Sequence, residues 1–141
     1  MYLLDTDYLS LIQRGGIQGR SILLRLTETT TPFATTIITY EEQTRGWLDR
    51  LSRAKTSTEQ VNAYQRLQQH TVHYRDINVI TFDIAAAQEY GQIRKAYPRL
   101  GKMDLRIAAI ALTQRATVLT RNYKDFGQIT NLKTEDWSIQ S

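Results

Sequence analysis

Three acidic residues stand where their side chains could meet and bind a metal ion. Asp5 follows a short apolar run, Glu42 lies one turn beyond a second such run, and Asp104 opens a long apolar segment. Carboxylates brought together repel one another unless a cation neutralises them, so a cluster of three predicts a metal site. Ligands that are all oxygen favour Mg²⁺ or Mn²⁺ over zinc. Such an ion binds phosphate oxygens and activates water, which is the chemistry of phosphodiester hydrolysis.

The sequence also allows a structural role for each acid. Asp104 could cap the amino end of its helix, and Glu42 could complete a capping box that begins at Thr39. Glu41 competes with Glu42, but consecutive helix residues point about 100° apart, so only one of them can face a pocket. Spacing alone leaves the chemical and the structural interpretations open.

Apolar segments alternate along the chain in lengths that predict strands separated by helices. We expect strands at residues 1–4, 33–38, 78–82, 116–120 and 132–139. We expect helices at residues 8–14, 21–26, 39–55, 57–70 and 83–97, and a buried, almost wholly apolar helix from Asp104 onward. A Ser57-x-x-Gln60 pattern is the expected cap of the fourth helix. The alternation favours an α/β sandwich with a mainly parallel sheet.

Such a sheet would bring the acids together, although they are far apart in the sequence. Sites of parallel sheets lie outside the carboxyl ends of the strands. Asp5 ends the first expected strand, and Asn122 and Asp125 follow the fourth. We therefore expect these residues at the same edge of the sheet as Glu42 and Asp104.

Length and composition bound the kind of protein. A chain of 141 residues with 41% hydrophobic content suits one domain, expected to span residues 1–141 with a helical arm at about 40–72. The absence of cysteine excludes disulfides and zinc–thiolate sites, and the net charge of +4 suits a polyanionic partner without requiring one. No apolar run approaches the roughly 20 residues that cross a bilayer, and no segment resembles a secretory signal. We expect a soluble cytoplasmic protein with no membrane partner.

Four segments carry a pattern in a fixed order: YLLDTDYLS, TTIITYEEQTRG, YGQIRKAYPRLGKMDLRIAAIAL and LTRNYKDF. Their order and spacing resemble the four signature blocks of PIN-domain nucleases, specifically the VapC-type toxins of bacterial toxin–antitoxin pairs. The resemblance spans nearly the whole chain, apart from residues 51–76, which carry no family motif. It implies a Rossmann-like α/β/α sandwich that cleaves RNA with Mg²⁺ or Mn²⁺.

By this resemblance, Asp5, Glu42 and Asp104 take the acidic positions that bind metal and catalyse cleavage. Asn122 stands where many relatives have Asp, so Asn122 could bind a metal-bound water or Asp125 could substitute for the fourth carboxylate. The family resemblance also implies a homodimer and inhibition by a small VapB-like antitoxin protein. Neither the RNA target nor the number of metal ions follows from the sequence.

Basic residues surround Asp104 and offer either phosphate contacts or an ordinary solvated face. They are Arg94, Lys95, Arg99, Lys102 and Arg106. Arg121 is a further candidate beside Asn122. Contact with RNA phosphates is our hypothesis for four of these residues: Arg94, Lys95, Lys102 and Arg121.

Histidines and tyrosines carry weaker patterns. His70 and His73 stand three residues apart, but two ligands without a third do not make a metal site, so we expect solvated residues at a helix end. Tyr40, Tyr90 and Tyr97 could stack on unpaired RNA bases, although helical spacing favours core packing for Tyr90. None of them is counted as a site residue.

Two other functions fit parts of the pattern. A phosphoacceptor receiver domain also combines a doubly wound sheet, strand-end aspartates and Mg²⁺, but it needs an Asp after a middle strand, where this chain has Tyr40 and Glu41. The second is a noncatalytic RNA-binding or protein-interaction module with a decayed site, suggested by Asn122. Cleavage with added Mn²⁺ separates this alternative from a nuclease.

Overall fold

Five short strands form one parallel sheet in the computed structural model, which describes residues 1–138. They are β1 (Tyr2–Leu4), β2 (Phe33–Thr36), β3 (Val79–Ile80), β4 (Thr117–Leu119) and β5 (Lys133–Glu135). Their order is β3-β2-β1-β4-β5, so the chain builds first one side of β1 and then the other. Leu3 lies opposite both Ala34 and Val118, which sets the central register. The predicted parallel sheet is confirmed.

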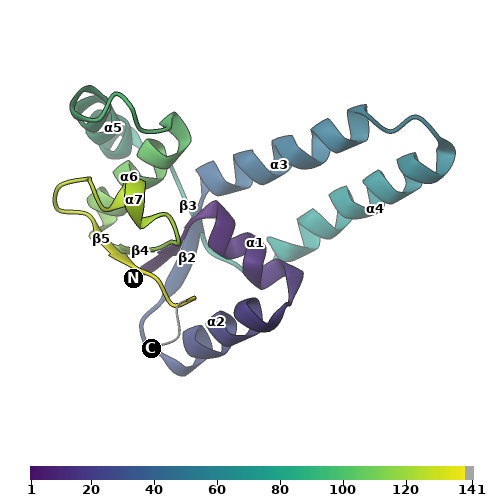
Figure 1. The fold of residues 1–141 in the computed structure, drawn as a ribbon, viewed down its shortest axis with the longest axis horizontal. Coiled ribbons are helices and arrows are strands. Elements are labelled where there is room, and N and C mark those ends of the chain that lie inside the picture. The colour runs from purple at the N-terminus through teal and green to yellow at the C-terminus, as the bar shows by residue number, and fades with distance from the viewer. Residues whose placement is uncertain (139–141) are drawn as a thin grey trace.

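Helices cover both faces of this sheet (Figure 1). They are α1 (Thr6–Arg14), α2 (Ile17–Glu28), α3 (Ile37–Ser52), α4 (Ser57–His73), α5 (Ile84–Ala96), α6 (Lys102–Gln114) and α7 (Tyr123–Phe126). Neighbouring strand residues point to opposite faces, and the core divides accordingly. Leu3 and Val118 pack in the cluster formed with α5 and α6, whereas Leu4 and Leu119 pack with α1 and α2. The predicted α/β/α sandwich is confirmed.

Helices α3 and α4 run beside each other and project away from the sheet (Figure 1). We call this pair the arm. Its buried side chains are few: Ile38 and Thr39 at the base of α3, and Ala63 and His70 in α4. The arm therefore presents mostly exposed surface.

Several predicted boundaries are wrong because the capping residues differ from those expected. The strand predicted at residues 33–38 ends at Thr36, whose side chain accepts a hydrogen bond from the backbone N–H of Thr39 and starts α3. Helix α4 begins after Thr56, which accepts a hydrogen bond from the backbone N–H of Glu59. The expected cap at Ser57 is therefore one residue too late.

Other predicted boundaries are also wrong. Asp5 caps α1 and starts that helix before residue 8, and α2 extends well beyond the predicted 21–26. The last strand covers only Lys133–Glu135, and Ile139 of the predicted strand lies outside the described residues. The short helix α7 was not predicted.

Helix α6 is the most buried helix, as its apolar sequence predicts. Leu105 and every residue from 107 to 111 are at most 1% exposed. Within residues 1–138, no helix is both long enough and apolar enough to span a membrane.

Candidate active site

Asp5 lies at the carboxyl end of the central strand β1 and is only 5% exposed. Its Oδ1 accepts a hydrogen bond from the backbone N–H of Tyr8 at 2.8 Å, so Asp5 is the N-cap of α1. Burial raises the pKa of Asp5 to about 6; hydrogen bonds from Thr120 and Tyr8 act against this rise, and the charges of Asp7 and Asp104 add to it. Asp5 is thus a cap whose surroundings disfavour its negative charge.

Glu42 is held from the first turn of α1. Thr6 Oγ1 donates a hydrogen bond to Glu42 Oε1 at 2.7 Å, and the hydroxyls of Thr6 and Thr39 are 3.1 Å apart. The neighbouring Glu41 instead pairs with Arg45 at 2.5 Å. Thr39 lies inside α3, so the capping-box interpretation of Glu42 is wrong. Of the two adjacent acids, Glu42 is the one directed towards the end of β1.

Asp104 does not cap its helix. It is the third residue of α6, whose N-cap is Gly101, so the expected start at Asp104 is two residues too late. Burial raises the pKa of Asp104, and the charges of Glu42 and Asp125 raise it further. Because Asp104 in turn raises the pKa of Asp5, it is electrostatically coupled to the other two acids.

Asn122 bridges two carboxylates at the start of α7. Its Nδ2 donates hydrogen bonds to Asp125 Oδ2 at 3.1 Å and, more weakly, to Asp104 Oδ2 at 3.4 Å. The backbone N–H of Asn122 donates to Thr120 Oγ1 at 2.9 Å, which fixes the loop after β4. The amide therefore links Asp104 to Asp125, and its hydrogen bond lowers the pKa of Asp104.

The acids at this edge have the ligand atoms that a hard divalent cation prefers, but their side chains are too far apart to enclose one. Asp5, Glu42 and Asp104 offer only oxygen atoms, and no Lys or Arg within residues 1–138 forms an ion pair with them. Burial is the main cause of the raised pKa values of Asp5 and Asp104, and the charges of neighbouring carboxylates add to it. However, no group of three acidic or histidine side chains in the described residues is close enough to enclose an ion. Ion binding would therefore require these side chains to move together.

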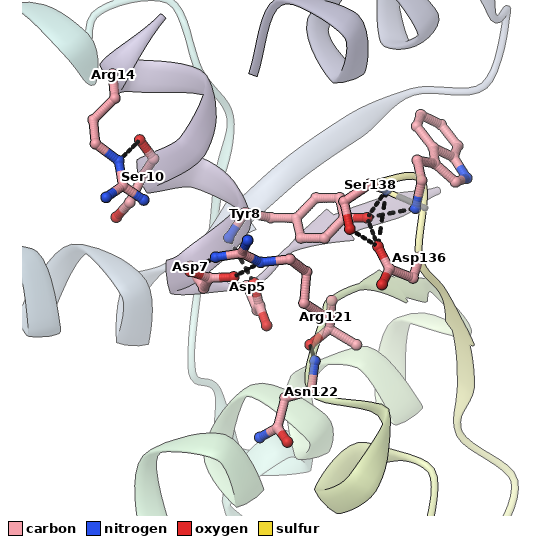
Figure 2. Close-up of polar contacts among 11 residues, drawn as sticks. Asp5, Asp7, Tyr8, Ser10, Arg14, Arg121, Asn122, Asp136 and Ser138 are labelled. Atoms are coloured by element: carbon pink, nitrogen blue, oxygen red, sulfur yellow. Dashed lines mark hydrogen bonds and ion pairs between the residues drawn. The ribbon is translucent and has the colours of Figure 1, made fainter. Parts of the chain in front are cut away.

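An ion pair borders this edge (Figure 2). Arg121, the second residue after β4, donates from Nε and Nη2 to the two carboxylate oxygens of Asp7 at 2.7 and 2.8 Å. The hydrogen bond that Arg121 donates to Asp7 is the largest cause of a raised pKa of Arg121, and the charges of Asp7, Asp136 and Asp5 add to it. Tyr8 donates to Asp136 Oδ1 at 2.5 Å, which ties the chain after β5 to α1. A guanidinium group thus stands beside Asp5 without pairing with it.

The other basic candidates lie on α5, α6 and the turn between them. Four are exposed: Arg94, Lys95, Arg99 and Lys102. Arg106 packs over the ring of Tyr90 at 5.0 Å from its centroid, and Tyr90 packs against the core, as its helical spacing favours. Contact of the exposed residues with RNA phosphates stays a prediction.

His70 is 3% exposed, so the prediction of a solvated residue is wrong. Its Nε2 lies 2.8 Å from Thr44 Oγ1, and its ring stacks on Tyr40 with centroids 5.2 Å apart. Tyr74 meets the same ring edge-on at 5.0 Å. Burial lowers the pKa of His70, and His73 lowers it further. The physical reason is that α4 turns this residue towards α3 at the base of the arm.

Two features of this site escaped the sequence patterns. Thr6 orients Glu42, and its only signal was a hydroxyl residue between two acids after a strand, which is also a common capping pattern. Asp7 and Arg121 are separated by 114 residues, so no local spacing could reveal their pairing.

Comparison with known proteins gives partial sequence similarity to two ribonucleases. One is the tRNA(fMet)-specific endonuclease VapC of Shigella flexneri, 38% identical over 66 residues, which are 44% of this chain and 50% of that protein. The other is Ribonuclease VapC2 of Rickettsia felis, 34% identical over 65 residues, 43% of this chain and 48% of that protein. In these matches the chain spans about half the length of each curated relative.

The fold and a family comparison extend over much more of the chain. The structure of VapBC2 from Rickettsia felis bound to a DNA fragment from its promoter has a TM-score of 0.73 at 24% identity, covering 96% of this chain and 98% of that chain. This likeness establishes the fold. The PIN domain matches residues 2–132, well over half of the 141 residues. The chain therefore belongs to the PIN domain family.

Proposed function

We propose that this chain is an endoribonuclease that depends on Mg²⁺ or Mn²⁺ and acts as the toxin of a toxin–antitoxin pair. The observation that carries the proposal is the convergence of three acids from separate elements at one edge of the sheet. Asp5 comes from the end of β1, Glu42 from α3 and Asp104 from α6, and Asp104 is coupled to both of the others. The ribonuclease names of the two similar proteins support the same activity.

The side chains divide the work of such a site. Asp5, Glu42 and Asp104 would hold the ion, which when bound supplies positive charge to the phosphate and a more acidic water. Thr6 keeps Glu42 directed inward through their 2.7 Å hydrogen bond. Asn122 holds Asp104 and Asp125 and occupies the fourth position of the site with them.

The buried acid makes the site sensitive to pH. Because the pKa of Asp5 is raised to about 6, a fraction of the metal-free protein carries a proton there near neutral pH. Cation binding must displace that proton, since carboxylate ligands bind ions in their charged form. Metal affinity should therefore increase as the pH rises through about 6.

Substrate and partners complete the proposal. Arg121 is held beside Asp5 by Asp7, where its guanidinium group can meet an RNA phosphate. Arg94, Lys95 and Lys102 are exposed and available for further phosphate contacts. The similar Rickettsia felis structure is a VapBC complex, which supports a VapB-like antitoxin as partner. By the family resemblance we also propose a homodimer that acts in the cytoplasm.

The central experiment is incubation of the purified protein with total RNA, with Mn²⁺ or with excess EDTA, followed by sequencing of the new RNA ends. We expect defined new ends with Mn²⁺ and none with EDTA. Glu42→Gln should abolish them. Glu41→Gln is the matched control, because Glu41 pairs with Arg45 and should leave cleavage intact.

Two results would contradict this function. Undiminished cleavage in EDTA would exclude metal dependence, and equal activity of the Glu41 and Glu42 variants would exclude the acidic edge as the site. RNA binding without any cleavage would favour the noncatalytic module.

Metal binding has a readout besides activity. A ligand that binds only the folded state stabilises it by about 2.7 kcal/mol at a hundredfold excess over its Kd. Mn²⁺ should therefore raise the melting temperature of the wild type and have little effect on Asp104→Asn. An equal shift in both proteins would place the ion elsewhere.

A further inference from the structure

A groove of about 1180 Å³ runs between α1 and the arm. Arg14 lines it from α1, Gly46, Trp47 and Arg50 from α3, and Arg66 from α4. These five residues lie outside the acidic edge. The lining of the groove is rich in guanidinium and amide groups, which are hydrogen-bond donors suited to a polyanion.

The groove begins at the proposed active site. Thr6 and Glu42, which are joined by a hydrogen bond, line its inner end at the base of the arm. Glu42, Gly46 and Arg50 follow one another at intervals of four residues and so share one face of α3. Arg50 lies about 12 Å from Glu42 along the helix axis, given a rise of 1.5 Å per residue. A ligand that contacts both ends must therefore be an extended chain.

Three arginines that line the groove form no ion pair within residues 1–138: Arg14, whose Nε donates to the carbonyl oxygen of Ser10, and Arg50 and Arg66. Arg53 is paired with Asp49, and Glu59 accepts a hydrogen bond from the backbone before α4. Arg50 and Arg66 are exposed. The groove is therefore a net cationic path that leads away from the acids.

Trp47 adds a flat surface to this path. Its ring is half-buried, and the Arg50 guanidinium lies 5.9 Å from the ring centroid. Beside it, a side chain on Gly46 would meet no atom within 4 Å, so the groove is open at this residue. The wall behind is fixed, because Gln43 donates hydrogen bonds to Ser10 at 3.1 Å and Gln13 at 2.9 Å.

We propose that this groove binds single-stranded RNA on one side of the bond to be cleaved. Arg50 and Arg66 contact phosphates, and Trp47 stacks on an unpaired base; positively charged grooves with aromatic surfaces bind single strands in this way. A duplex does not fit this scheme, since its bases are already stacked. Only the placement of the cleaved bond at Glu42 rests on the proposed function.

The test measures RNA binding in EDTA, so that neither metal nor cleavage takes part. Fluorescence anisotropy with a labelled single-stranded RNA gives Kd over a range of salt concentrations. Arg50→Gln combined with Arg66→Gln should weaken binding on the order of tenfold. The slope of log K against log salt should fall by about 1.4, because each arginine that neutralises a phosphate contributes about 0.7 to it.

A matched pair of substitutions controls for net charge. Arg20 and Arg75 are exposed and lie outside the groove, so Arg20→Gln with Arg75→Gln removes the same charge from another surface. This control should keep the wild-type Kd and salt slope. Circular dichroism of both double variants confirms that each is folded.

The two tryptophans provide a second measurement. In Trp137→Phe the tryptophan fluorescence comes from Trp47 alone, and in Trp47→Phe it comes from Trp137 alone. RNA should quench the emission of Trp47 and leave that of Trp137 unchanged. Trp47→Phe should bind more weakly than wild type because the smaller ring offers less area for stacking.

Several outcomes would overturn the proposal. Equal Kd values and salt slopes for the two double variants would show that the groove arginines do not contact RNA, and unquenched Trp47 would exclude base stacking. If the groove variant kept RNA binding but lost binding to a protein partner, the groove would be a protein interface. Normal cleavage by Glu42→Gln would contradict the proposed function alone, because the binding test does not depend on it.

Discussion

The acidic edge of the sheet, formed by Asp5, Glu42 and Asp104, and the groove along the arm are built in opposite ways. Asp5 is 5% exposed and follows two strand residues that are fully buried. Arg50 and Arg66 stand exposed on helices that bury few side chains. Catalytic groups need a well-defined position. Packed elements fix the backbone that carries the acids, so only their side chains have to move to bind an ion. Contacts with a flexible strand tolerate looser placement, so they can occupy the projecting arm.

The largest effect expected from this contrast is on activity at the acidic edge. Asp104→Asn should lower the cleavage rate by about three orders of magnitude, because several kcal/mol of transition-state stabilisation depend on the bound ion. The fold should be unchanged, since Asp104 does not cap α6 and an Asn oxygen can still accept from Asn122. Single-turnover cleavage together with circular dichroism measures both. A parallel loss of structure would assign Asp104 a structural role instead.

The buried charge of Asp5 at this edge should lower the free energy of unfolding when no metal is bound. Asp5→Asn keeps an oxygen for the backbone N–H of Tyr8 and removes a buried charge. The rise of the Asp5 pKa from 3.8 to about 6 corresponds to about 3 kcal/mol at a pH above both values. In EDTA near pH 8, the variant should therefore have a larger free energy of unfolding than wild type. Urea unfolding measures the difference.

The pH dependence of that difference has a definite sign. The folded-state pKa of Asp5 is raised, so the folded protein takes up its proton first and gains stability as the pH falls through about 6 towards 3.8. The advantage of Asp5→Asn should shrink over this interval and vanish below it. A variant less stable than wild type at pH 8 would mean that the charge of Asp5 strengthens its cap more than burial opposes it.

The two regions also differ in what could be predicted from sequence. The sheet and α6 were predictable because hydrophobic runs of strand and helix length have few other solutions. The three acids could be predicted from their position after strands and from the family resemblance. The hydrogen bond from Thr6 to Glu42 could not, because it depends on how α1 packs against α3. His70 was misjudged because a polar residue on a polar helix gives no sign of burial. The groove could not be predicted because its lining combines residues of α1, α3 and α4 that are far apart in the sequence.

A smaller effect is expected where the arm joins the body. His70→Gln removes a ring that packs against Tyr40 and Tyr74 and changes the partner of Thr44. The loss should be about 1–2 kcal/mol of unfolding free energy, the usual size of one aromatic contact and one hydrogen bond. Urea unfolding at pH 7.5 measures it. No loss at that pH would mean that His70 does not hold α4 against α3.

His70 should respond to pH in the direction opposite to Asp5. Its folded-state pKa is lowered, so wild type loses stability as the pH falls below the unfolded value of 6.5. The His70→Gln variant should lack this loss. The comparison is made in the Asp5→Asn background between pH 7.5 and pH 5.5, so that Asp5 does not mask it. Equal pH dependence with and without His70→Gln would contradict the assignment.

The smallest effect separates stability from binding within the arm itself. Gly46 and Gly91 are both exposed helical glycines whose added Cβ would meet no atom within 4 Å. Gly46→Ala and Gly91→Ala should each raise the unfolding free energy by about 0.5–1 kcal/mol, because alanine loses less backbone entropy in a helix. Only Gly46 lines the groove beside Trp47, so only its substitution should also weaken RNA binding in the anisotropy assay. If both variants gain stability and bind RNA equally well, the base that stacks on Trp47 does not lie over Gly46, and the RNA lies closer to Arg66.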